Sequence, residues 1–99
     1  MSERIKIIEA RKRILQYLDM MYPSPMKADT LFQSIVYVSP DYEPALYKKD
    51  VYYLREKGYV EFVDEKIGGF KDFGQKVIKL TARGKEIAEQ TLSDPALEI

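Results

Sequence analysis

One segment constrains the fold more than any other: residues 46 to 63, LYKKDVYYLREKGYVEFV, where a helical pattern runs through a glycine into a strand pattern. Tyr47, Val51 and Leu54 recur at the three-and-four spacing that lines one face of a helix. Gly58 can adopt the left-handed backbone conformation that commonly ends a helix. The residues after it alternate between inward and outward side chains, as in a strand. This order predicts an α+β fold in which the helix packs beside an antiparallel hairpin.

Two helices are predicted before this segment. The first covers residues 3 to 22, and prolines end it because proline does not fit in the interior of a helix. Its apolar stripe is Ile7, Ala10, Ile14, Tyr17, Leu18 and Met21. The second is about ten residues long, with Ser24 as its cap and Pro25 at its first position. Its buried stripe is Leu31, Phe32, Ile35 and Val36.

The third helix is expected over residues 43 to 57, with Ser39 or Asp41 as its cap. A hairpin over residues 59 to 80 follows, formed by two strands and a loop rich in turn residues. Thr81 then caps a last helix, which runs from Ala82 to about Leu92. The prediction is one domain over residues 1 to 93 and a C-terminal tail over residues 94 to 99.

The composition excludes several classes of function. The chain of 99 residues contains neither cysteine nor histidine, so it lacks the usual ligands of a zinc site and an imidazole base. We therefore expect no enzyme activity, no metal site and no cofactor. No apolar run approaches the roughly 20 residues of a membrane-spanning helix, and the N-terminus lacks the pattern of a secretory signal. We expect a cytoplasmic protein with no membrane partner.

Two short motifs, LREKGYV at residues 54 to 60 and LTARGKEIA at residues 80 to 88, resemble anchors shared by many bacterial winged-helix regulators. The layout resembles the PadR-like and ArsR-like groups, and small phage and prophage regulators look similar. The resemblance implies a winged helix, with a three-helix core, a two-stranded wing and a C-terminal helix (ααα-ββ-α). It does not extend to metal sensing, because the cysteine and histidine ligands are absent, or to the long dimerisation helices of PadR-like proteins.

The resemblance implies sequence-specific binding of double-stranded DNA by a small transcriptional regulator. Helix 43–57 would enter the major groove and hairpin 59–80 would act as the wing. The expected DNA contacts are Lys48, Lys49, Tyr52, Arg55, Lys66 and Lys71. A symmetric operator would require a homodimer, because one small domain reads one half-site.

The charge balance keeps an alternative open. The formal net charge is +0, whereas phosphate binding usually accompanies a basic excess. The eight tyrosines suit a winged-helix module that binds another protein within a larger assembly. In that case the lysines form a solvated face. The basic run Arg11-Lys12-Arg13 on the first helix is either a solvated face, which we favour, or a phosphate contact. Phe70 and Phe73 either fold back on the core or form an apolar surface for the partner.

Overall fold

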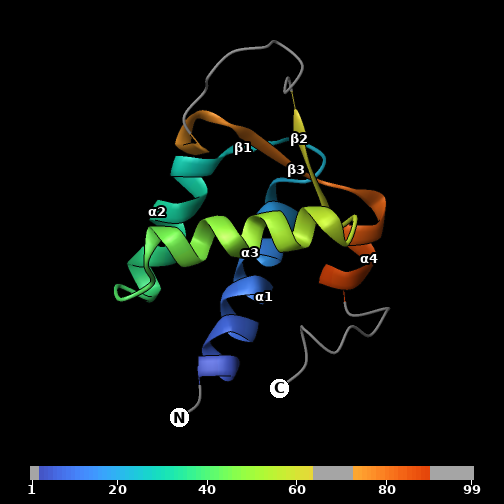
Figure 1. Ribbon diagram of the computed structural model, residues 1–99. Helices are drawn as coiled ribbons and strands as arrows, with labels where there is room; N and C mark the ends of the chain where they lie inside the picture. The colour runs from blue at the N-terminus through green and yellow to red at the C-terminus, as the bar shows by residue number, and fades with distance from the viewer. Residues whose placement is uncertain (1–2, 64–72, 90–99) are drawn as a thin grey trace.

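The computed structural model describes residues 3–63 and 73–89, and the side chains from residue 8 onward (Figure 1). This part of the chain is an α+β fold with four helices and one three-stranded antiparallel sheet. The elements, in chain order, are α1 (Glu3–Met21), β1 (Met26–Lys27), α2 (Ala28–Val38), α3 (Pro44–Glu56), β2 (Val60–Val63), the 3-10 turn η1 (Phe73–Gln75), β3 (Val77–Leu80) and α4 (Ala82–Ala88).

The sheet has the order β1-β3-β2, so the predicted two-stranded hairpin gains a third strand. Met26 pairs with Ile78 of β3, and the amide of Ala28 donates to the carbonyl of Lys76 at 2.8 Å. Because this pairing holds residues 26 and 27 extended, α2 begins at Ala28, with Lys27 as its cap. The prediction that Ser24 and Pro25 open the second helix is therefore wrong.

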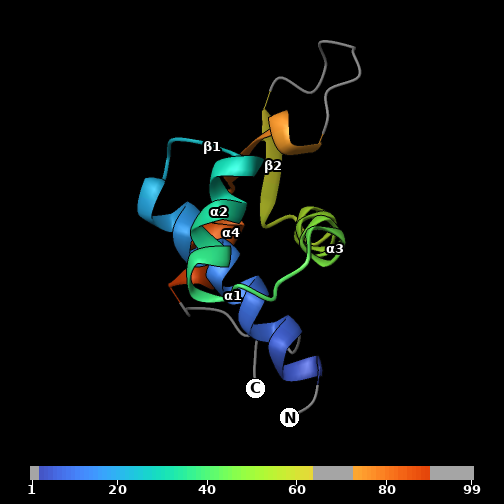
Figure 2. The same cartoon turned by 90° about the vertical axis from the view of Figure 1, so that its left-hand side faces the viewer.

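The core lies between the helices and the inner face of the sheet. Figure 2 views α3 end-on: α3 lies on one side of the molecule, α2 and α4 lie on the other, and α1 runs obliquely from that side to a position below α3. The fully buried side chains are Ile14, Leu18, Ala28, Leu31, Ile35, Val51, Leu54 and Ile78. On α1 the stripe differs from the predicted one, because Ile8 and Leu15 are buried whereas Met21 is 46% exposed.

Both ends of α3 are defined locally. Glu43 precedes the helix and makes no side-chain capping bond, and Pro44 supplies the first position, where a missing amide costs nothing. The predicted cap at Ser39 or Asp41 is wrong, and Ser39 instead ends α2 with its amide bonded to the carbonyl of Ile35. Gly58 has φ +83°, which confirms the left-handed residue that follows the helix.

The cap of α4 is confirmed. The Thr81 hydroxyl accepts a hydrogen bond from the amide of Gly84 at 3.0 Å and donates to the carbonyl of Gly58 at 2.6 Å. One side chain thus joins the start of α4 to the turn after α3. The helix ends at Ala88, with Glu89 as its C-cap, and so stops short of the predicted Leu92. Residues 90 to 92 and the tail over residues 94 to 99 lie outside the described residues. No helix within 3–63 and 73–89 is long and apolar enough to cross a membrane.

Candidate functional site

Three of the predicted contact residues lie together on the side of α3 that faces away from the core. Lys48 and Arg55 are exposed, and Tyr52, between them, is half-buried. Tyr52 is half-buried because its ring meets the sheet: it lies edge-on to the Phe62 ring, with 5.5 Å between centroids, and 5.7 Å from the Phe73 ring. Tyr52, Phe62 and Phe73 form an aromatic triad that joins α3, β2 and η1.

Three cations surround this triad. The guanidinium of Arg55 lies 4.8 Å from the centroid of Phe62, and the ammonium of Lys76 lies 5.3 Å from the same ring. The ammonium of Lys48 lies 5.9 Å from the centroid of Phe73. Attraction of a cation to an aromatic face contributes about 0.5–1 kcal/mol at exposed sites. We call the set Lys48, Tyr52, Arg55, Phe62, Phe73 and Lys76 the cationic face.

The remaining predicted contacts are not part of the cationic face. Lys49 is exposed but lies about 100° round the helix from Lys48, on the side of Asp50, whose pKa its charge helps to lower. Lys66 and Lys71 lie outside the described residues, as does Phe70.

Sequence reasoning missed Phe62 and Lys76 as members of this face. A signal was present, because Phe62 and Phe73 stand on either side of the loop between two strands that pair with each other. Of the two alternatives for Phe73, the structure shows the one in which it packs on the core, since its ring lies 5.6 Å from that of the buried Tyr47.

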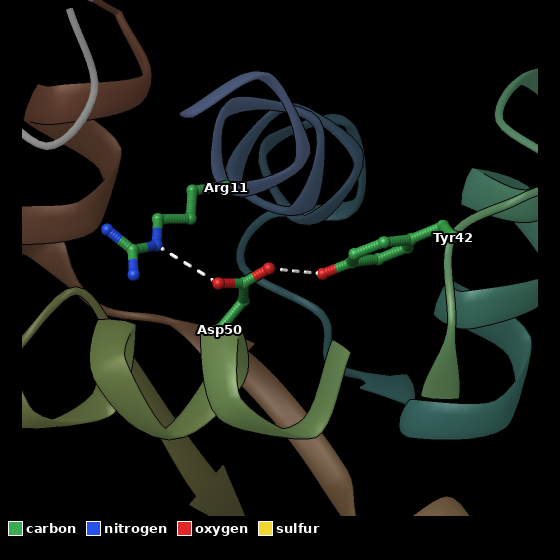
Figure 3. A network of polar contacts seen from close by, with 3 residues as sticks. All are labelled: Arg11, Tyr42 and Asp50. Carbon is green, nitrogen blue, oxygen red and sulfur yellow. Dashed lines mark hydrogen bonds and ion pairs between the residues drawn. The ribbon is translucent and has the colours of Figure 1, made fainter. Parts of the chain in front are cut away.

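A second polar group lies on the opposite side of α3. Asp50 is a carboxylate with only 4% of its surface exposed. Arg11 of α1 donates from Nε to Oδ1 of Asp50 at 3.1 Å, and the Tyr42 hydroxyl donates to Oδ2 (Figure 3). The expectation that Arg11 belongs to a solvated basic face is wrong, because it is partly buried and paired. We call Arg11, Tyr42 and Asp50 the Asp50 network.

Burial governs the titration of this network. It raises the pKa of Asp50 because the charged form loses water, and the hydrogen bonds from Tyr42 and Arg11 offset part of that rise. Burial and the neighbouring carboxylate also raise the pKa of Tyr42 well above its ordinary range. Tyr42 therefore stays protonated as a donor. Every buried side-chain nitrogen or oxygen in the described part of the chain has a hydrogen-bond partner.

The cationic face and the Asp50 network differ in what they can do chemically. The network is inward-facing and internally satisfied, so it holds α3 against α1. The cationic face carries the exposed cations Lys48 and Arg55 and the half-buried Lys76, beside aromatic rings from three elements. Such donors suit an anionic partner, since charge-assisted hydrogen bonds to phosphate or carboxylate are the strong ones.

No protein-family model, curated protein or solved structure matches this chain.

Proposed function

We propose that this chain is a winged-helix protein that binds double-stranded DNA sequence-specifically as a small transcriptional regulator. In this proposal α3 enters the major groove and the hairpin of β2 and β3 lies alongside as the wing. The observation that carries the proposal is the cationic face, on which α3, η1 and the hairpin contribute cations and aromatic rings to one surface.

The chemistry of the face fits a nucleic-acid backbone. Lys48, Arg55 and Lys76 supply donors for phosphate oxygens, and the Tyr52 hydroxyl adds a neutral donor. Lys and Arg on an exposed helix face also reach the acceptor edge of guanine in the major groove. The ring contacts of the aromatic triad bring the helix and the hairpin together, so the three cations belong to one surface.

The cationic face gathers Lys48, Arg55 and Lys76 on one surface, although the charges of the whole chain cancel. Asp50 is buried and paired with Arg11, and Asp19 is paired with Lys85 at 2.7 Å on the side where α1 meets α4. These two acids therefore do not face a ligand bound at the cationic face. Binding to phosphates depends on the charges near them, because salt at 0.15 M screens exposed charges beyond about 8 Å.

A protein-interaction module is the second candidate, and exposed apolar side chains favour it. Met20, Met21 and Tyr22 are exposed at the end of α1, and Tyr37, Val38 and Leu46 are exposed where α2 ends and α3 begins. Tyr37 and Met20 are 89% and 77% exposed. Apolar surface of this kind is common at protein interfaces when it is contiguous.

A salt series separates the two candidates. The affinity for a labelled duplex pool is measured by fluorescence anisotropy, with one protein titration at each of several salt concentrations from low to moderate. The logarithm of the affinity should fall linearly with the logarithm of the salt concentration. Selection from the pool should then enrich a defined sequence. If the duplex does not bind at the lowest salt, or binds with no salt slope, the DNA proposal is overturned and the protein-interaction module becomes the better account.

A further inference from the structure

We propose that Arg11, Tyr42 and Asp50 are positioning residues, which fix the rotation of α3 about its axis and so the direction in which the cationic face points. They do this without touching the nucleic acid. The inference rests on the proposed function, and it assigns a binding role to residues on the side of α3 remote from the cationic face.

The placement of Asp50 on the helix supports this role. At 100° per residue, Asp50 lies about 160° from both Lys48 and Tyr52 round the axis of α3. Any rotation of α3 about its axis that shifts the Asp50 carboxylate one way therefore shifts Lys48 and Tyr52, on the other side of the axis, the opposite way. A constraint on the buried carboxylate is a constraint on the exposed donors.

Two hydrogen-bond donors, one on α1 and one in the segment before α3, constrain the Asp50 carboxylate. Arg11 of α1 donates to one oxygen of Asp50, and Tyr42, just before α3, donates to the other. The two donors approach the carboxylate from opposite sides (Figure 3). The Arg11 guanidinium also lies 3.8 Å from the centroid of Tyr53, three residues further along α3. Arg11 thus contacts α3 at two points, and rotation in either direction breaks a hydrogen bond.

Stability by itself does not account for a buried ionised group at this place. The apolar side chains that α3 buries, Tyr47, Val51 and Leu54, already attach it to the core, and replacement of a buried ion pair by apolar residues of similar volume is often neutral or stabilising. Apolar burial is non-directional, whereas hydrogen bonds prefer a narrow range of angles. The network supplies the directional constraint that the apolar contacts of α3 lack.

The test uses a charge-neutral triple variant, Arg11→Met, Tyr42→Phe and Asp50→Leu. We expect a folded protein with a thermal stability close to wild type, and duplex DNA affinity lower by about two- to thirtyfold, the range over which residues remote from a ligand modulate binding. The salt slope should fall by about 1 for each phosphate that the variant no longer neutralises. Nuclear Overhauser effects between the Tyr52 ring and the rings of Phe62 and Phe73 should change, because α3 has turned.

The matched control is the charge-neutral double variant Asp19→Leu and Lys85→Met, which removes the 2.7 Å ion pair between α1 and α4. It should bind DNA as wild type does. If the triple variant keeps both wild-type affinity and the wild-type Overhauser effects at Tyr52, the positioning role is overturned.

Two further outcomes stay decisive. If the triple variant does not fold, the single variant Tyr42→Phe replaces it, because this variant removes the Tyr42 donor and leaves the Arg11–Asp50 ion pair. Altered Overhauser effects at Tyr52 together with weaker DNA binding then support the positioning role. Overhauser effects and DNA affinity equal to those of wild type overturn it. If wild-type protein binds no duplex, the proposed function fails by itself, and the Overhauser effects at Tyr52 in the variants still decide whether the network sets the rotation of α3.

Discussion

At the scale of single residues, Asp50 shows how burial changes the meaning of a charge. In the sequence it is one of several acids in a segment with many lysines. In the fold it is 4% exposed, and both of its oxygens accept hydrogen bonds. Because burial outweighs the two hydrogen bonds and raises the pKa of Asp50, folding favours the protonated form of this side chain.

The variant Asp50→Asn tests whether the pKa of Asp50 is raised in the folded protein, through the pH dependence of stability. A pKa that is higher in the folded state means that the native protein binds more protons than the unfolded chain between the ordinary value of 3.8 and the folded value. The stability contributed by Asp50 is therefore fully present below 3.8 and is lost as pH rises through the folded pKa. We expect the free energy of unfolding of wild type, relative to Asp50→Asn, to increase as pH falls from 7 toward 4.

Urea unfolding of both proteins at several pH values in this range measures the difference. Carboxylates common to the two proteins cancel in the comparison. A difference that stays constant, or that shrinks as pH falls, would contradict the raised pKa of Asp50.

At the scale of elements, the two sequence motifs that carry the winged-helix resemblance meet in space. The Thr81 amide donates to the carbonyl of Tyr59 at 3.0 Å, and its hydroxyl donates to that of Gly58. The Arg83 guanidinium lies 5.5 Å from the Tyr59 ring. The glycine turn after α3 and the cap of α4 are therefore one structural unit, although they are far apart in the chain.

Gly84→Ala should disrupt this unit. A Cβ at residue 84 would lie 2.0 Å from the carbonyl oxygen of Tyr59 and 2.8 Å from a methyl carbon of Leu80. Because the carbonyl oxygen of Tyr59 belongs to the backbone, it cannot rotate away as a flexible side chain can, and α4 must move away from the start of β2. We expect a decrease of about 1–3 kcal/mol in the free energy of unfolding, as for other overpacked sites.

Chemical denaturation of Gly84→Ala checks this expectation, with Ala82→Gly on the exposed side of α4 as a control. Ala82→Gly should cost no more than about 1 kcal/mol, the ordinary penalty for glycine in a helix. A Gly84→Ala variant as stable as wild type would show that α4 does not press closely on the start of β2.

At the scale of the whole molecule, the location of charge matters more than its sum, which is +0. We expect Lys48→Ala, Arg55→Ala and Lys76→Ala, combined, to lower duplex affinity and to reduce the salt slope by about 3, because in the proposed complex each of the three cations would neutralise one phosphate. The free energy of unfolding should fall by at most about 1.5–3 kcal/mol, because the variant loses three cation–ring interactions that each contribute about 0.5–1 kcal/mol at an exposed site. Anisotropy across a salt series and thermal unfolding measure the two effects.

The control removes three cations elsewhere: Lys12→Ala and Arg13→Ala on α1, with Lys27→Ala on β1, the edge of the sheet opposite β2. It lowers the net charge equally. If the affinity falls by the same factor in both variants, the binding is non-specific attraction to the whole surface rather than recognition by the cationic face.

Several features could be predicted because they depend on neighbours in the chain. The buried face of α3, the left-handed Gly58 and the Thr81 cap each follow from local spacing or local hydrogen bonding, and all three are confirmed. The start of α2 could not be predicted in this way. Its local prolines favoured an earlier start, and pairing of Met26 with Ile78 overrode them.

The sequence by itself determined where α3 ends, where α4 begins and which residues could carry positive charge, because a helix-ending glycine, a capping threonine and apolar periodicity act over a few residues. Only the tertiary structure decided which cations share a surface and which acid is buried. Lys48, Arg55 and Lys76 meet because the rings of Tyr52, Phe62 and Phe73 pack across three elements. Asp50 and Arg11 are paired because α1 crosses α3 at that turn. Contacts between segments far apart in the chain depend on how whole elements pack, which local patterns do not encode.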